Sequence, residues 1–440
     1  MEQNYDEKRE ARRKRRRRSQ ILAYLTVIIM ILVMAVGIVF GVQEIKKIAG
    51  QQEETQQSQQ EKVEELLATE ESIEVPAPTP TVVELTPEQK LDEIVNAGIE
   101  VMPLEDKVAG LFIVTPEAIT GVSTAIQAGE GTQEALAKYA VGGLVYFEKN
   151  IQSESQIKLM LENTQLYTKY PLFIAVDEEG GEVSRIAKAG LAEKVDGAQT
   201  IGATGDANNA YQAGTAIGIY LSGLGFNLDF APVADLANVE KSVMEKRSYG
   251  ADAATVSGFV NSMMQGLEEQ NVTACLKHFP GIGSSTEDTH KGLASTDRSK
   301  EDFQANEFAV FRAGIEAGAD MIMVSHMAAP SLAGDNTPSS LSSEVVTNIL
   351  RNELNFKGVI ITDALNMSAI SEYYSSEQAA VMALRAGCDM VLMPENFEEA
   401  YQGVLKAVQE GTISEERIND SLRRIYRIKY ADKIEETEAE

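Results

Sequence analysis

In the stretch "GVIITDALNM", residues 358–367, an apolar run without polar alternation leads directly into a carboxylate, Asp363. Such a run is typical of a parallel strand that is buried on both faces. Eight such runs, separated by segments of helical period over about 320 residues, predict an α/β fold with a single (β/α)8 TIM-type barrel and disfavour an open doubly wound sheet. The other seven runs are "LFIV" (111–114), "GGLVYF" (142–147), "LFIAV" (172–176), "FNLDFAP" (226–232), "ACLKHF" (274–279), "MIMVS" (321–325) and "MVLMP" (390–394).

The N-terminal end of the chain differs sharply from the rest. Residues 1–20 contain nine Lys/Arg and four Asp/Glu, whereas the 22 residues 21–42 contain no charge. At about 1.5 Å per residue, the uncharged run makes about 33 Å of helix, which is enough to cross a bilayer. We therefore expect a transmembrane helix at 21–42, with the basic arm 1–20 in the cytoplasm. A cleaved signal peptide is the alternative.

Residues 43–86 are rich in Gln, Glu, Thr and Pro and nearly free of aromatic residues. Such a segment buries too little apolar surface to offset its ordering entropy, so we expect a disordered, flexible linker that acts as a stalk. Residues 87–440 then form the barrel domain. The expected localisation is the cell membrane, with one membrane pass and the barrel domain outside the cell.

The charge and cysteine content restrict the possible partners. The formal net charge of the chain is −28, and residues 1–20 contribute +5 of it, so the external part is more acidic still. This charge argues against nucleic acid as a partner. Cys275 and Cys388 are the only cysteines and both lie in apolar runs, so we expect buried thiols rather than a disulfide framework. We expect a monomer.

Polar residues follow several of the predicted strands. In a barrel the carboxyl ends of all strands meet at one mouth, where active sites are built. A single ionisable residue at a strand end means little, but several together indicate a site. The residues in question are Asp177, Asp235, Lys277, His278, His326 and Asp363.

The stretch "KHFPGIGSSTEDTHKG", residues 277–292, contains two of the three histidines in the chain. Gly281, Gly283 and the small polar residues after them predict a mobile loop over the barrel mouth. Asp288 precedes His290 by two positions, so on an extended segment the carboxylate can accept a hydrogen bond from the imidazole and fix its tautomer. This pair suits a general acid/base.

Asp363, at the end of a buried strand, suits a nucleophile that attacks an anomeric carbon, as in retaining glycosidases. An imidazole in place of the usual second carboxylate avoids repulsion near a negatively charged substrate. Two other classes stay open: a surface sugar-binding protein without catalysis, and a metal-dependent barrel hydrolase. The ligands of the metal would be His278, His290, His326 and Asp363.

Four motifs, "FIAVDEEGGEVSRI", "EKRSYG", "KHFPGIGSSTEDTHKGL" and "GVIITDALNM", together resemble the β-N-acetylhexosaminidases of glycoside hydrolase family 3. The resemblance covers about residues 100 to 430. It implies a barrel, a retaining covalent mechanism, and neither cofactor nor metal. It also implies Asp363 as the nucleophile and His290 as the acid/base with Asp288 as its partner. The sugar-binding positions that it implies are Asp177, Arg185, Arg247, Lys277 and His278.

The resemblance implies that the chain releases terminal N-acetylglucosamine from peptidoglycan fragments or related oligosaccharides, with hydrolysis or phosphorolysis both open. Arg247, Lys277 and His278 are expected to supply a local positive field that the acidic exterior lacks. Two positions depart from the family pattern: Glu182 stands where arginine is usual, and Ile282 where histidine is usual. Both leave the fine specificity open. A β-glucosidase-like member, with a carboxylate acid/base in a separate domain, is the alternative within the family.

Overall fold

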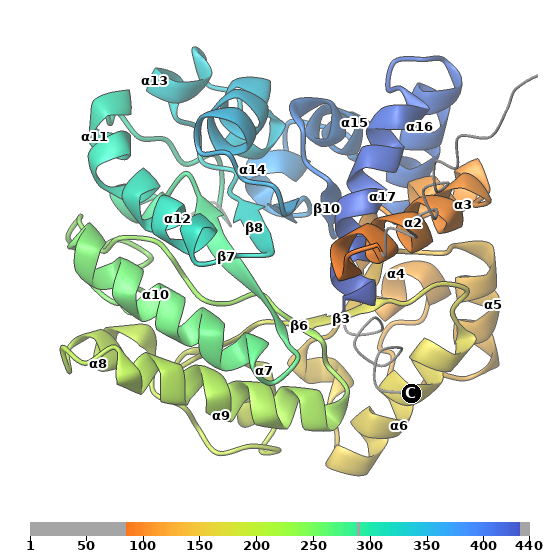
Figure 1. The fold of residues 1–440 in the computed structure, drawn as a ribbon, viewed down its shortest axis with the longest axis horizontal. Helices are drawn as coiled ribbons and strands as arrows, with labels where there is room; N and C mark the ends of the chain where they lie inside the picture. Colours follow the sequence, from red (N-terminus) through yellow and green to blue (C-terminus); the bar gives the residue numbers. More distant parts are fainter. Residues whose placement is uncertain (1–84, 288–290, 432–440) are drawn as a thin grey trace, which may run out of the picture. The chain divides into compact units, whose positions relative to one another are not determined.

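Eight parallel strands close into a barrel in the order β1-β10-β9-β8-β7-β6-β3-β2 (Figure 1). The computed structural model describes residues 85–287 and 291–431. Each of the eight apolar runs overlaps one strand of this barrel, so the predicted eight-stranded α/β barrel is confirmed. The strands are β1 (Phe112–Val114), β2 (Gly143–Val145), β3 (Phe173–Val176), β6 (Leu228–Asp229), β7 (Thr273–Phe279), β8 (Met321–Val324), β9 (Val359–Ala364) and β10 (Met390–Leu392).

The strands are apolar because helices cover the barrel on its outside and side chains fill its inside. Strand β7 is the longest, and it pairs in parallel with β8 from Cys275 onward. The register of this pair shifts between Lys277 and Phe279. Such an irregularity re-aims the side chains of a strand. It lies at the carboxyl end of the strand, where the barrel mouth opens.

The main helices follow the strands and surround the barrel (Figure 1). Several begin with a side chain that caps the first turn, for example Ser153 before α6 and Asp252 before α10. The longer helical elements are α5 (Glu130–Lys138), α6 (Glu154–Tyr167), α9 (Asn208–Leu224), α10 (Ala253–Glu268), α12 (Glu307–Glu316), the π-helical η4 (Glu344–Glu353), α15 (Ser376–Ala386), α16 (Phe397–Gln409) and α17 (Glu415–Tyr430).

Shorter elements occupy the connections between strands and helices. They include the two-stranded antiparallel ribbon of β4 and β5, which directly follows β3. Their bounds are α3 (Leu104–Ala109), α4 (Pro116–Thr120), η1 (Glu148–Asn150), β4 (Glu178–Gly180), β5 (Val183–Ser184), α7 (Arg185–Lys188), α8 (Ala198–Gly202), η2 (Ile282–Ser284), α11 (Lys300–Ala305), α13 (Pro330–Ala333), η3 (Ser339–Leu341) and α14 (Ser368–Ser371).

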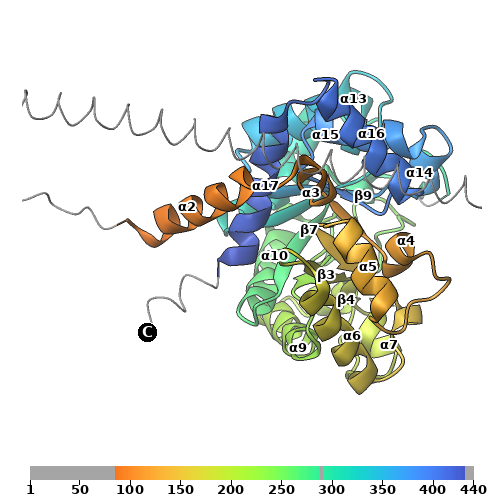
Figure 2. The same cartoon turned by 90° about the vertical axis from the view of Figure 1, so that its right-hand side faces the viewer.

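The two ends of the described domain pack together away from the barrel mouth. Figure 2 shows α2 (Pro87–Glu100) beside α17, on the side opposite to α4 and α14. Helix α17 is tied to the start of β10 by Asp389, which is fully buried. The Asp389 carboxylate accepts from the Arg351 and Arg424 guanidinium groups at 2.6 Å and 3.0 Å and from the Ser421 hydroxyl at 2.8 Å.

Replacing Asp389 with alanine is expected to destabilise the barrel by about 3 kcal/mol, because it leaves two partly buried guanidinium groups without their counter-charge. For a domain of this size the midpoint of thermal unfolding should fall by several degrees. The matched control is Asp420→Ala. Asp420 lies on the more exposed side of helix α17, where it pairs with Arg423. Thermal unfolding followed by circular dichroism checks both, and equal shifts for the two variants would contradict the assignment.

Several predictions concern parts of the chain that lie outside the described residues. These are the basic arm 1–20, the transmembrane helix 21–42 and most of the linker 43–86. Within residues 85–287 and 291–431, no helix is both long and apolar enough to span a bilayer. Cys275 and Cys388 are buried free thiols, as predicted.

Candidate active site

A cavity of about 470 Å³ opens at the carboxyl ends of the barrel strands. This volume lies in the range of small-molecule sites. Its wall combines apolar side chains, such as Phe147, Met244 and Met393, with a small number of charged groups. Six of the eight predicted site residues line it, namely Asp177, Arg185, Arg247, Lys277, His278 and Asp363. The other two, Asp288 and His290, lie outside the described residues.

Charged side chains from three connections meet on one wall of this cavity. The Lys277 ammonium, at the end of β7, donates to Asp177 Oδ1 at 2.8 Å and lies 2.6 Å from Glu179 Oε1. The Arg247 guanidinium holds the same Glu179 carboxylate with two bonds of 2.8 Å and 2.6 Å. Glu179 therefore bridges two cations. It was not among the predicted site residues.

The ionisation of this cluster follows from its pairing. Burial alone would raise the pKa of Glu179, but Lys277 and Arg247 together hold it well below the ordinary value. Burial alone would lower the pKa of Lys277, but Asp177 and Glu179 raise it above the ordinary value. Glu179, Arg247 and Lys277 are therefore charged at neutral pH.

The expectation that Arg247, Lys277 and His278 supply an open positive field is wrong. Each of the three faces a carboxylate: Arg247 faces Glu179, Lys277 faces both Asp177 and Glu179, and the His278 ring bonds to Asp235. The buried site cannot hold uncompensated cations cheaply, so the carboxylates neutralise them. The cluster consequently offers directed hydrogen bonds rather than net positive charge.

Arg185 is positioned by a buried carboxylate behind the cavity wall. Glu178 is fully buried, and its side chain accepts from the backbone N–H groups of Ile186 and Ala187, at the start of α7. Helix α7 begins at Arg185, so these bonds fix the residue in place. The Arg185 guanidinium lies 3.9 Å from Asp177, and its Nε–H has no hydrogen-bond partner among the described residues.

Asp363 extends from the end of β9 into the cavity. Its Oδ1 accepts from the Ala364 N–H at 2.8 Å. Burial alone would raise the pKa of Asp363, but its polar and charged neighbours, including the Ala364 amide and Lys277, hold it below the ordinary value. The carboxylate is therefore ionised at neutral pH, as attack on an electrophilic carbon requires.

His326 lies directly behind Asp363 and is fully buried. Its Nε2 lies 2.9 Å from the Ala364 carbonyl oxygen, and its Nδ1 lies 2.8 Å from the Ser340 hydroxyl. Because a carbonyl can only accept, Nε2 carries the proton and donates it. Both ring nitrogens are thus engaged in hydrogen bonds. His326 is therefore not free to bind a metal, as the hypothesis of a metal-dependent hydrolase requires. Within the described residues no three His, Cys, Asp or Glu side chains are grouped as a metal site would require.

Packing, rather than loop mobility, explains Gly281 and Gly283 in the stretch 277–292. Gly281 has φ of 126°, and a Cβ there would lie 2.4 Å from the Glu307 side chain. A Cβ on Gly283 would lie 1.9 Å from the Leu236 carbonyl oxygen. The segment up to residue 285 is largely buried. The predicted mobility therefore does not apply to these glycines, and the Asp288–His290 pair stays a prediction.

The two departures from the family pattern lie in different settings. Ile282 lines the cavity and is 7% exposed, so it adds an apolar surface where a polar one was usual. Glu182 lies outside the cavity wall and pairs with Lys246 at 2.7 Å, with both side chains largely exposed. Glu182 therefore braces two loops at the rim.

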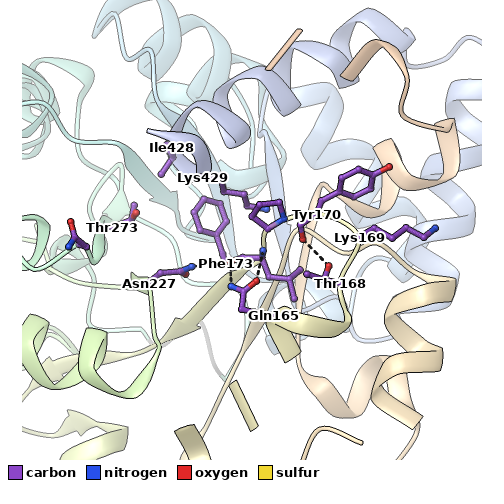
Figure 3. A pocket seen from close by; sticks show the side chains of 12 residues that line it. Gln165, Thr168, Lys169, Tyr170, Phe173, Asn227, Thr273, Ile428 and Lys429 are labelled. Atoms are coloured by element: carbon purple, nitrogen blue, oxygen red, sulfur yellow. Dashed lines mark hydrogen bonds between the residues drawn. The ribbon is translucent and has the colours of Figure 1, made fainter. Parts of the chain in front are cut away.

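A second cavity, of about 500 Å³, lies at the opposite end of the barrel, next to the start of β3. Figure 3 shows Lys429 of α17 beside Phe173 in this cavity. The Lys429 ammonium donates to the Gly142 carbonyl at 2.6 Å and lies 4.7 Å from the Phe173 ring centroid. Burial lowers the pKa of Lys429 to about 7.

Comparison with known proteins places the chain among carbohydrate-active enzymes. The profile of the Glycosyl hydrolase family 3 N terminal domain matches residues 103–428. The Beta-hexosaminidase A of Pseudoalteromonas piscicida is 32% identical over 67% of this chain, and a Beta-hexosaminidase of Nitrosomonas eutropha is 34% identical over 59%. A solved glycoside hydrolase family 3 beta-N-acetylglucosaminidase from Paenibacillus sp. is 33% identical over 76% of this chain, with a TM-score of 0.71.

The relatives differ in length from this chain. The match spans 54% of the Pseudoalteromonas protein, 76% of the Nitrosomonas protein and 64% of the Paenibacillus chain. The chain thus corresponds to about half of the first of these proteins. In the described part, the shared region includes all eight barrel strands and the cavity at their carboxyl ends.

Proposed function

Because this chain belongs to glycoside hydrolase family 3, we propose that it is a retaining β-N-acetylhexosaminidase that uses Asp363 as its nucleophile. The observation that carries the proposal is the cavity at the barrel mouth, which is lined both by an ionised Asp363 and by a cluster of paired charged groups. The names of the hexosaminidase relatives support the choice of sugar.

In the proposed mechanism the terminal sugar lies in the cavity with its anomeric carbon next to Asp363. The charged cluster has the composition for binding ring hydroxyls: the Asp177 carboxylate accepts hydrogen bonds, and the guanidinium of Arg185 donates them. Asp363 attacks the anomeric carbon and forms a glycosyl ester, and water then hydrolyses this ester with overall retention. The Ala364 N–H holds the carboxylate in one orientation.

The proton for the leaving oxygen is assigned to His290, with Asp288 as the residue that orients its ring. This part of the proposal rests on their spacing in the sequence and on the resemblance to the family. The same imidazole then removes a proton from the attacking water. The ring is cationic before it donates this proton and neutral afterwards, so in neither state does it repel negative charge on the rest of the substrate.

The substrate is proposed to be a peptidoglycan fragment or a related oligosaccharide with a terminal N-acetylglucosamine. The proposed location is the outer surface of the cell membrane, with residues 21–42 as the anchor. This assignment follows from the uncharged run 21–42 and the basic residues before it. It places the barrel where wall fragments are available.

The test is a panel of p-nitrophenyl glycosides and muropeptides offered to the full chain. We expect release of N-acetylglucosamine with a kcat/KM at least about tenfold above that for the glucoside, because a fitted polar site rejects a substrate that leaves its groups unpaired. Preference for the glucoside would favour the β-glucosidase alternative, and binding without turnover would favour a sugar-binding protein. Parallel assays with and without phosphate separate hydrolysis from phosphorolysis.

A further inference from the structure

Asp235 is a fully buried carboxylate that follows β6 and lies just behind the wall of the active-site cavity. It does not line the cavity itself, but it contacts two residues that do. Its Oδ2 bonds to His278, and its Oδ1 accepts from the Ile282 backbone N–H at 2.6 Å. These hydrogen bonds offset the cost of burying the carboxylate, because a buried polar group without partners is destabilising.

The contact with His278 determines which ring nitrogen carries the proton. The distance from His278 Nδ1 to Asp235 Oδ2 is 2.7 Å, and the His278 backbone N–H donates to the same oxygen at 3.1 Å. Because Oδ2 accepts from this N–H and Oδ1 accepts from the Ile282 N–H, the carboxylate acts as an acceptor toward the ring as well, and Nδ1 is the protonated nitrogen. In the neutral ring Nε2 then carries a lone pair. Among residues 85–287 and 291–431, Nε2 has no hydrogen-bond partner.

The second contact fixes the chain that follows His278. Besides the bond from the Ile282 N–H, the backbone of Gly283 packs so closely on Leu236 that a Cβ would meet its carbonyl oxygen. The segment 277–283 thus contacts residues 235–236 at His278, at Ile282 and at Gly283. Displacement of the backbone at residues 282–283 would break both contacts.

We propose that Asp235 is a positioning residue that holds His278 as the Nδ1–H tautomer, so that Nε2 accepts a hydrogen bond from a substrate hydroxyl beside Asp363. The inference rests on the proposed function, which makes the occupant of the cavity a sugar. It has a consequence for specificity: the position facing His278 requires a group that donates. A substrate with a methyl ether or no hydroxyl there is bound less well, because the buried lone pair is left without a partner.

The tautomer can be measured directly, because the chain contains only three histidines. Long-range proton–nitrogen NMR spectra of the full chain, with labelled imidazoles, give one pattern for each ring, and His278→Gln identifies the signal of His278. We expect the Nδ1–H pattern for His278 in the parent protein. An Nε2–H pattern there would overturn the proposal, and this result does not depend on any variant being folded.

Asp235→Asn is expected to change the NMR pattern of His278. The asparagine amide has one accepting oxygen, whereas Asp235 uses one oxygen for His278 and the other for the Ile282 N–H. The matched control is Asp229→Asn, a fully buried aspartate on β6 that accepts from the Glu178 N–H and does not contact His278. The control should leave the His278 signal unchanged. An equal change in both variants would contradict a specific role for Asp235.

A double-variant cycle on p-nitrophenyl N-acetylglucosaminide supplies the functional readout. We expect Asp235→Asn and His278→Gln each to reduce kcat/KM by about 10- to 100-fold, and the double variant to lose no more than the larger single loss. If the loss in the double variant equals the product of the two single losses, Asp235 acts independently of His278, and this result would overturn the proposal. A parent chain that hydrolyses no substrate refutes the proposed function instead, while the NMR pattern still decides the role of Asp235.

Discussion

Replacing Asp363 with asparagine is expected to reduce kcat on p-nitrophenyl N-acetylglucosaminide by on the order of 10⁴-fold, as loss of a covalent nucleophile does in other enzymes. The asparagine oxygen can still accept from the Ala364 N–H, so the local structure should persist. The amide, however, cannot form the glycosyl ester. Steady-state kinetics on purified protein check the result.

Two further measurements make the Asp363 result specific. The thermal midpoint of the variant should stay within a few degrees of the parent, which separates lost chemistry from lost folding. The pKa of Asp363 is held below its ordinary value, so in the parent this group should stay ionised in mild acid and any loss of kcat/KM near pH 5–6 should come from another group. A variant as active as the parent would exclude Asp363 as the nucleophile.

Replacing Glu179 with glutamine is expected to lower kcat/KM by about 10²-fold, the usual cost when groups of a site are displaced by about 1 Å. The change removes the charge that Lys277 and Arg247 share, with contacts of 2.6 Å to each. The two cations then repel each other across the cavity wall. Because both were held by one carboxylate, the loss should appear in KM as well as in kcat.

The matched control for Glu179 is Glu182→Gln, which makes the same chemical change three positions further along the chain. Glu182 is largely exposed and pairs only at the rim with Lys246. Exposed ion pairs contribute little, so we expect kcat/KM to change by less than about twofold. Similar losses in both variants would mean that the general charge of this loop, rather than the bridge at Glu179, matters for activity.

The strands and the position of the site could be predicted from the sequence, because both depend on local patterns. Each buried strand is a short apolar run, and the residue after it must lie at the barrel mouth. Asp177, Lys277 and Asp363 are therefore found in one cavity although they are far apart in the chain. The same reasoning predicted buried thiols at Cys275 and Cys388.

The pairing of charges could not be predicted, because it depends on contacts between distant segments. Glu179 and Arg247 are 68 positions apart, and nothing in either motif shows that they form an ion pair. One signal was nevertheless present. Glu179 follows Asp177 by two positions on an extended segment, so both face one side, which is the argument that singled out Asp288 and His290.

The most direct test of the account is to trap and locate the glycosyl ester. The full chain is treated with an N-acetylglucosaminyl fluoride that also carries fluorine at C5, which slows hydrolysis of the ester, and the digest is analysed by mass spectrometry. We expect one sugar on the peptide that contains Asp363, attached to that side chain. A sugar attached to any other residue would contradict it.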